Sequence, residues 1–284
     1  MGDHVLNDIQ LAELNVLKKL IGIFEQEHLT YYALGGTLLG AIRHHGFIPW
    51  DDDVDIGMPR RDYEKFLQIA DSYLDGDVKI FTVMNGRGEY SYYYPRVVDT
   101  SIQLIRKKSE SETVLHPWVD VFPLDGVPET DEELHGWYKK VKRLLKLFNL
   151  SQFEYYFYVN SPEGEVSNRN RALKTLVKKV LYQTKAYKLL NTKRIWRKLD
   201  ALLKKYDYDS SSRLVNACGF WKLKELFPKE IYGEGKQYPF EDILIHGPAD
   251  SDFVLTQMYG DYMTPPADKD KNHHFVTMAK ESKQ

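Results

Sequence analysis

The hydrophobic pattern predicts amphipathic helices that alternate with short strands. Apolar residues recur at near-helical spacing between Leu6 and His28, which predicts a helix with one buried face. The short apolar run Tyr31–Leu34 then meets Gly35, which predicts a strand that turns into a second helix. Helical spacing returns over Asp62–Tyr73. Such an order of elements is typical of an α/β fold of the α+β type, a small mixed sheet flanked by helices.

Further strands are predicted in the middle of the chain. The β-rich runs Val78–Met84, Tyr92–Val98 and Ile102–Arg106 are separated by turn signals, which predicts a hairpin or meander. Trp118–Phe122 is predicted to be another short strand. Asp125 stands before a glycine and is interpreted as a turn residue.

The second half of the chain is predicted to be helical before it returns to mixed structure. Asp131–Leu150 has a helical pattern, Phe240–His246 is predicted to be a strand, and Ser251–Tyr259 a helix that stops at Gly260. Three regions follow from this pattern: an α/β core over residues 1–128, a helical basic subdomain over 129–210, and a C-terminal α/β segment over 211–284 that completes the core.

Composition limits the class of protein. A chain of 284 residues with 43% hydrophobic residues can bury one sizeable core and an appended subdomain. A single cysteine, Cys218, excludes a disulfide framework and fits a reducing compartment; we interpret it as a small buried residue. The sequence shows no apolar run long enough to span a bilayer and no secretion signal, so we expect a cytoplasmic protein.

Charge is distributed unevenly. The net charge of −2 gives no argument for a nucleic-acid partner. However, Arg169–Lys205 holds 13 lysines or arginines and one acid, Asp200, so this segment carries +12 and the rest of the chain −14. The segment is either a solvated helix pair or a surface that contacts an anionic membrane or a polyanionic acceptor.

The candidate chemistry lies between Gly35 and Met58. Gly35 and Gly36 allow a tight turn and a close approach of a ligand to the backbone. Thr37 is predicted to cap the following helix, whose first amides favour an anion such as phosphate. Arg43 is a candidate phosphate clamp, because a guanidinium binds phosphate oxygens bidentately.

The carboxylates after this helix point to a metal. Asp53-Val54-Asp55-Ile56 alternates polar and apolar residues, so a strand would place Asp53 and Asp55 on one face. Two such carboxylates suit a hard cation such as Mg²⁺. An EF-hand loop that starts at Asp51 is excluded, because its sixth and twelfth positions hold Ile56 and Asp62.

The run GGTLLGAIRHHGFIPWDDDVDI resembles the LicD family of phosphocholine transferases, whose wider group includes the fukutin-like proteins. That family belongs to the polymerase-beta-like nucleotidyltransferase superfamily. The resemblance is strongest over Leu29–Phe66 and resumes at HPWVDVFPLDG (His116–Gly126) and MYGDYMTPP (Met258–Pro266). It implies a nucleotidyltransferase-like sheet and metal-assisted transfer of phosphocholine from CDP-choline to a hydroxyl of a cell-surface glycan precursor, of the teichoic acid or lipopolysaccharide type, with release of CMP.

The resemblance also implies roles for individual residues. Asp53 and Asp55 would hold Mg²⁺ or Mn²⁺, and Asp120 would be a third metal ligand or the general base. The acceptor would be lipid-linked, at the inner face of the membrane. Three alternatives stay open: transfer of another phospho-alcohol such as ribitol phosphate from its CDP-alcohol, transfer of a nucleoside monophosphate, or a non-catalytic nucleotide-binding member of the superfamily.

Overall fold

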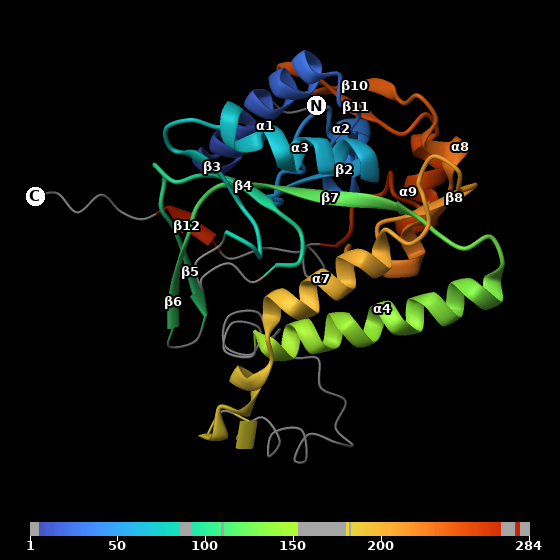
Figure 1. Ribbon diagram of the computed structural model, residues 1–284. Helices are drawn as coiled ribbons and strands as arrows, with labels where there is room; N and C mark the ends of the chain where they lie inside the picture. The colour runs from blue at the N-terminus through green and yellow to red at the C-terminus, as the bar shows by residue number, and fades with distance from the viewer. Residues whose placement is uncertain are drawn as a thin grey trace, which may run out of the picture.

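The computed structural model describes residues 6–85, 92–108, 111–152, 180–181, 183–267 and 276–278. Much of the predicted basic segment, residues 169–179 and 182, lies outside these ranges. Within them the chain has a mixed α/β fold, as predicted, with a mixed sheet between two groups of helices (Figure 1).

Strand β7 (Trp118–Gly126) is the central element of the main sheet. All nine of its residues are buried. It pairs in parallel with β2 (Val54–Pro59) and antiparallel with β4 (Arg96–Asp99) and β8 (Arg213–Val215). The sheet continues outward from these neighbours through β1 (Tyr32–Ala33) on β2, β3 (Val78–Phe81) on β4 and β9 (Leu226–Pro228) on β8.

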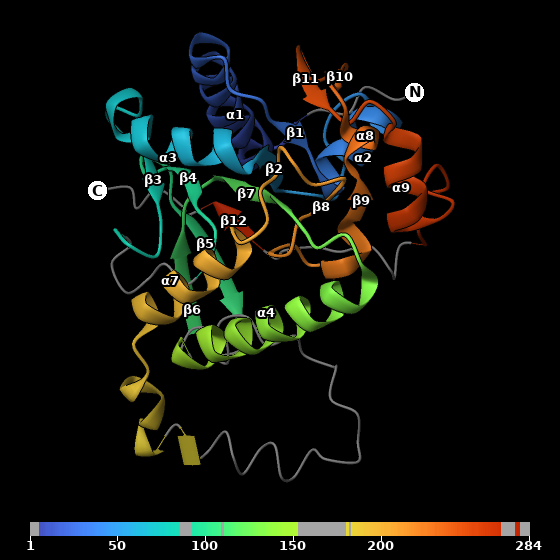
Figure 2. The same cartoon turned by 45° about the vertical axis from the view of Figure 1, so that its right-hand side comes forward.

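Helices lie on both sides of this sheet. In Figures 1 and 2, α1 (Asp8–Glu27) and α3 (Arg60–Tyr73) lie on one side, and α4 (Asp131–Ser151) and α7 (Thr192–Leu203) on the other. The predicted first helix is confirmed. It begins at a capping box formed by Asn7 and Gln10, and its inner face buries apolar side chains in the core.

The remaining described elements surround the main sheet. Within the described ranges there are also a separate sheet of three strands, a two-stranded hairpin and several short helices. The separate sheet has the order β12 (Val276–Met278), β5 (Leu104–Lys108), β6 (Ser111–Leu115). The hairpin and short helices are β10 (Lys236–Phe240), β11 (Ile243–Gly247), α2 (Gly35–His44), α8 (Lys229–Tyr232), α9 (Ser251–Tyr259), η2 (Ala186–Leu189) and η3 (Lys222–Glu225).

Three predictions of local structure need correction. Phe240–His246 is not one strand, because Glu241 adopts a left-handed conformation (φ 54°) and turns the chain between β10 and β11. The predicted meander is split, since β3 pairs with β4 whereas β5 joins the separate sheet. Asp125 is not a turn residue: it lies inside β7, where Arg60 binds it.

One hydrophobic core joins residues from all three predicted regions, among them Val121, Leu199 and Met258. The boundaries of these regions stay a prediction. Cys218 is buried, as predicted. Among the described helices, none combines the length and the apolar character that a membrane crossing requires.

Candidate active site

The register of two parallel strands brings two of the predicted carboxylates together. Asp55 of β2 lies opposite Asp120 of β7, and residues opposite each other in a parallel pair face the same side of the sheet. Asp53 directly precedes β2. Burial raises the pKa of Asp55 well above its usual range, and the charges of Asp53, Asp120 and Asp51 raise it further. These carboxylates therefore repel one another across a shared site.

Gly35 and Gly36 lie next to the acidic cluster, which consists of Asp51, Asp53, Asp55 and Asp120. Gly35 has a left-handed conformation (φ 50°), and a Cβ built on it would lie 3.4 Å from Oδ2 of Asp55. A Cβ on Gly36 would lie 2.5 Å from Oδ2 of Asp51, so the Asp51 side chain would have to move to admit it. The missing side chains thus allow carboxylates to approach the first turn of α2. The helix dipole favours negative charge there.

Thr37 does not cap α2, so that prediction is wrong. The helix begins two residues earlier, at Gly35, and its N-cap residue Leu34 makes no side-chain hydrogen bond. The Thr37 hydroxyl is turned toward β2 instead, where it accepts a hydrogen bond from the backbone N–H of Asp55 at 2.8 Å. Thr37 therefore fixes the position of Asp55 relative to the helix.

Asp120 is held by an arginine that the sequence analysis missed. Arg96 of β4 donates two hydrogen bonds to the Asp120 carboxylate, at 2.5 and 2.9 Å. The guanidinium lies between two rings, 3.8 Å from the centre of Tyr92 and 4.5 Å from that of Trp118. The sequence did contain a sign of this contact: Arg96 lies within the predicted strand Tyr92–Val98. A buried strand tolerates a charged residue only when that charge is paired.

The charge of Arg96 opposes the effect of burial on Asp120. Burial raises the pKa of the Asp120 carboxyl, and the Arg96 guanidinium lowers it; the net direction is upward. Both carboxylate oxygens accept from Arg96 in this structure. For Asp120 to bind a metal or take a proton, one oxygen would have to be shared with Arg96 or released by it.

Arg43 lies away from this cluster. It occupies the last turn of α2, eight residues after Gly35, or about 12 Å along the helix. Its Nη1 donates to the carbonyl of Tyr262 at 2.7 Å, and its Nε to Nε2 of His44 at 2.9 Å. The structure therefore places Arg43 beside the C-terminal motif Met258–Pro266 and not with the carboxylates.

Helix α1 contacts the loop before β2, which contains Asp51, Asp52 and Asp53. The Gln10 side chain, fully buried, donates to the carbonyl of Asp51 at 2.8 Å. Glu13, one turn further along, is fully buried as well. Burial raises its pKa well above the usual range, as do the charges of Asp53 and Asp52. Neither residue was a candidate from the sequence, since each looks like a surface position of an amphipathic helix.

The carboxylates of the acidic cluster are suitable ligands for a hard cation. Carboxylate oxygens are the ligands that Mg²⁺ and Mn²⁺ take in proteins, and a cation would relieve the repulsion that raises the pKa of Asp55. As the side chains stand, no three acidic, histidine or cysteine residues of the described chain converge closely enough to hold a metal. A site with three protein ligands would therefore require side chains to rotate, whereas one or two carboxylates with substrate phosphates would suffice for Mg²⁺.

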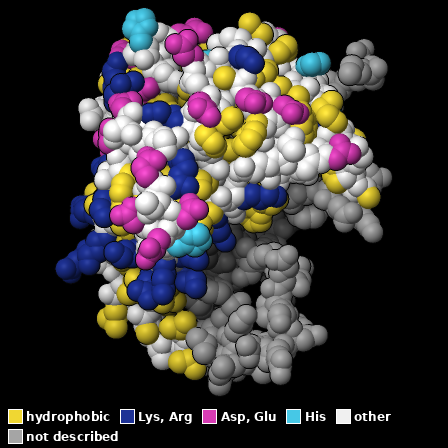
Figure 3. Space-filling view, turned by 90° about the vertical axis from the view of Figure 1, so that its right-hand side faces the viewer, with side chains coloured by type: hydrophobic (Ala, Val, Ile, Leu, Met, Phe, Trp, Pro, Cys, Tyr) yellow, Lys and Arg dark blue, Asp and Glu magenta, His cyan; other side chains and the backbone are white. Residues whose placement is uncertain are grey.

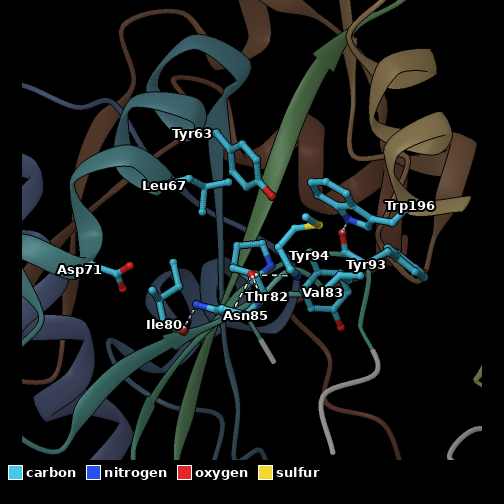
Figure 4. Close-up of a pocket in the computed structure, with 12 residues that line it drawn as sticks. Tyr63, Leu67, Asp71, Ile80, Thr82, Val83, Asn85, Tyr93, Tyr94 and Trp196 are labelled. Atoms are coloured by element: carbon cyan, nitrogen blue, oxygen red, sulfur yellow. Dashed lines mark hydrogen bonds between the residues drawn. The ribbon is translucent and has the colours of Figure 1, made fainter. Parts of the chain in front are cut away.

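An aromatic pocket of about 250 Å³ lies between α3, α7 and the ends of β3 and β4. In Figure 4 the rings of Tyr63, Tyr94 and Trp196 surround it. Tyr94 also packs on Phe122 of β7, with ring centres 4.2 Å apart. None of the acidic cluster lines this pocket, so it is separate from the carboxylate site.

Residues 28–154 match the family model for the LicD/FKTN/FKRP nucleotidyltransferase domain. These residues form a LicD-family nucleotidyltransferase domain. The match contains the acidic cluster, the glycines and Arg96, and it ends before the motif at Met258–Pro266. The resemblance inferred from the sequence is confirmed for this domain.

Individual relatives agree with the family match. The chain is 27% identical to the lipopolysaccharide cholinephosphotransferase LicD of Haemophilus influenzae, over 98% of this chain and 99% of the relative. It is 26% identical to an uncharacterized protein of Rickettsia typhi, over 68% of this chain and 56% of that one. A segment of 39 residues, 14% of this chain and 8% of the relative, is 49% identical to human ribitol 5-phosphate transferase FKRP.

Proposed function

We infer that this protein is a metal-dependent phosphotransferase that moves phosphocholine from CDP-choline to a hydroxyl of a glycan precursor and releases CMP. The observation that carries the proposal is the alignment of Asp55 with Asp120 over the glycine turn of α2. The full-length similarity to a lipopolysaccharide cholinephosphotransferase supports the choice of donor and acceptor.

The reaction is a displacement at phosphorus. The acceptor hydroxyl oxygen forms a bond to the β-phosphorus of CDP-choline, the bond from that phosphorus to the bridging oxygen breaks, and CMP leaves with this oxygen. The hydroxyl proton passes to a carboxylate, for which we propose Asp120. Such transfers depend mainly on positioning and on neutralisation of charge.

Each predicted site residue keeps a proposed role. Asp53 and Asp55, with Asp120 as a third ligand, would hold Mg²⁺ or Mn²⁺, which when bound neutralises the diphosphate. Gly35 and Gly36 would let the diphosphate approach the first amides of α2, while Thr37 fixes Asp55. Arg43 would offset negative charge on the part of the substrates that reaches the far end of α2.

The identity of the alcohol rests on aromatic side chains. A quaternary ammonium group is bound by ring faces, because it has no N–H to donate. The candidate rings are those close in sequence to the motif carboxylates or on neighbouring strands: Trp50, Tyr92, Tyr94 and Trp118. The short similarity to a ribitol 5-phosphate transferase keeps a CDP-polyol as the alternative donor.

A lipid-linked acceptor would bring the protein to the inner face of the membrane. Lys139, Lys140, Lys142, Arg143 and Lys146 are all exposed on α4. Lysine and arginine side chains gather on one side of the lower part of the molecule in Figure 3. Such a surface is typical of proteins that contact anionic lipids, and we propose this contact here.

The test is a comparison of donors. The protein is incubated with Mg²⁺, a glycan acceptor extract and CDP-choline, a CDP-polyol or CTP, and release of CMP or pyrophosphate is measured. We expect CMP from CDP-choline, and none after chelation of the metal. CMP from the CDP-polyol alone would replace choline as the substrate, pyrophosphate from CTP would favour a nucleotidyltransferase, and no release from any donor would favour the non-catalytic alternative.

A further inference from the structure

The C-terminal helix α9 brings a hydroxyl to the first residue of α2. The space above Gly35, in which a Cβ would lie 3.4 Å from Oδ2 of Asp55, is also bordered by the hydroxyl oxygen of Tyr259, at 3.8 Å. Tyr259 is the last residue of α9, more than 100 residues beyond the end of the family match. Two distant parts of the chain thus meet at the glycine turn.

The Tyr259 side chain is held in one orientation by Trp221. The two rings meet edge to face, with centres 5.6 Å apart. An indole N–H only donates, so the Tyr259 oxygen can only accept from Trp221, and the hydroxyl keeps its own proton for another partner. Burial and the charge of Asp55 raise the pKa of Tyr259, so this proton is present at neutral pH.

The segments that carry these two rings are bound to each other. The Gln257 side chain donates to the carbonyls of Lys224 and Leu226, at 2.7 and 3.0 Å. Nζ of Lys224 donates in return to the carbonyl of Met258 at 2.5 Å. The hydroxyl of Tyr259 is therefore positioned before any ligand arrives.

The Tyr259 proton has no acceptor within the described part of the chain. A hydroxyl that can still donate its proton, on a half-buried side chain next to carboxylates and the start of a helix, is suited to an oxygen of a bound phosphate group. An apolar packing role would not require this hydroxyl to point at the glycine turn.

We propose that Tyr259 is a substrate-binding residue whose hydroxyl donates a hydrogen bond to the diphosphate of the nucleotide donor, and that Trp221 is its positioning residue. This inference rests on the proposed function, because that function supplies the diphosphate. It adds to the site a residue that lies outside the matched nucleotidyltransferase domain.

The experiment measures binding separately from turnover. Binding of CDP with Mg²⁺ is titrated by calorimetry for the wild type, Tyr259→Phe and Trp221→Phe, and kcat and KM are measured with CDP-choline. Tyr259→Phe should weaken CDP binding about 10- to 100-fold, as expected for the loss of one hydrogen bond to a charged group. Trp221→Phe keeps a ring next to Tyr259 but removes the indole N–H, and should give a smaller loss.

Tyr238→Phe is the matched control. The Tyr238 hydroxyl donates to the carbonyl of Pro248 at 2.6 Å, away from the acidic cluster, so the variant loses one hydrogen bond and should bind CDP within twofold of the wild type. Thermal unfolding checks that each variant is folded. The proposal is overturned if Tyr259→Phe binds CDP as tightly as Tyr238→Phe, or if the wild type does not bind CDP. Binding without any CMP release would instead count against the proposed function alone.

Discussion

Two buried arginine–aspartate pairs bind strand β7 near its opposite ends. Arg96 donates to both oxygens of Asp120, at 2.5 and 2.9 Å, and Arg60 donates to both oxygens of Asp125, at 2.6 and 2.9 Å. The pairs have nearly the same geometry and the same burial. They differ in their neighbours, and we infer that the neighbours decide which pair takes part in chemistry.

Every carboxylate around Asp125 contacts a cation. Arg60 also contacts Asp200 at 3.1 Å, and Lys204 contacts both Asp200 and Glu64 at 2.9 Å, so two cations serve three carboxylates. Around Asp120, by contrast, the charges of Asp53 and Asp55 add to that of Asp120, and Arg96 contacts Asp120. A cluster with more excess negative charge favours binding of a cation, whereas the paired network joins β7 to α3 and α7.

The largest effect is expected for a substitution of Asp55. This carboxylate lies opposite Asp120, whereas the residue of β8 opposite Asp125 is Val215. Asp55→Asn should reduce kcat for CMP release to below a few per cent of the wild type. Because the pKa of Asp55 is raised in the folded protein, its ionisation at neutral pH opposes folding, so the variant should be at least as stable as the wild type. Thermal unfolding at pH 7.5 without metal measures this. More than a few per cent of wild-type kcat would contradict the metal-ligand role.

A paired substitution compares the two ends directly. Asp120→Asn should lower kcat per folded molecule by about 10²–10⁴-fold, as is typical for loss of a general base. Asp125→Asn should leave this kcat nearly unchanged and lower the free energy of unfolding by about 3–5 kcal/mol, because it leaves Arg60 buried with a weaker partner. Urea unfolding and active-site-normalised rates separate the two effects. Equal losses of kcat would mean that both pairs are structural.

The buried carboxylate of Glu225 affects both ends of β7, since its charge raises the pKa of Asp55 and that of Cys218, which the charge of Asp125 also raises. Burial raises the pKa of Glu225 to about 7, although hydrogen bonds from Trp221 and Asn216 lower it. The protonated form therefore stabilises the fold, and this stability is lost as the pH rises from about 4.5 to above 7.

Glu225→Gln should remove that pH dependence. The variant should match the wild type near pH 5 and exceed it at pH 8 by at most about 3 kcal/mol in the free energy of unfolding. Urea unfolding between pH 5 and pH 8.5 gives the comparison. A constant difference across this range would show that Glu225 does not titrate there.

The smallest effect is expected for membrane binding by the exposed lysine and arginine side chains of α4, the helix that follows the Asp125 end of β7. Each lysine or arginine of α4 near an anionic surface should contribute about 1 kcal/mol to binding, and salt should weaken it. Sedimentation with vesicles that contain or lack anionic lipid measures this for the wild type and for Lys139→Gln with Lys140→Gln. Equal recovery with both vesicles would leave these helices as solvated surfaces.

Local patterns were sufficient to predict part of this molecule. The helices α1, α3 and α9 follow from periodicity and stop signals. That Asp120 lies opposite Asp55 was implied by the family resemblance and not by the local pattern. Asp125 was misread because its local sequence, an aspartate before a glycine, is typical of turns. Its partner Arg60 lies 65 residues earlier, so the contact leaves no mark on the local pattern.

The same reason explains the site residues that were missed. Arg96 binds an aspartate 24 residues away, and Gln10 holds a carbonyl 41 residues away. Tyr259 reaches Gly35 from the other end of the chain. Spacing along the sequence carries no information about such contacts, which arise only when the sheet and the helices pack.

The hydrogen bond from Gln10 to the carbonyl of Asp51 also bears on how this family can be recombined. Residues 28–154, transplanted alone into another scaffold, would carry the acidic cluster without the helix that supports it. They would also lose β8, which pairs with the end of β7 at Asp125 and Gly126. Domain shuffling that preserved catalysis would have to move α1, the matched domain and the C-terminal segment together.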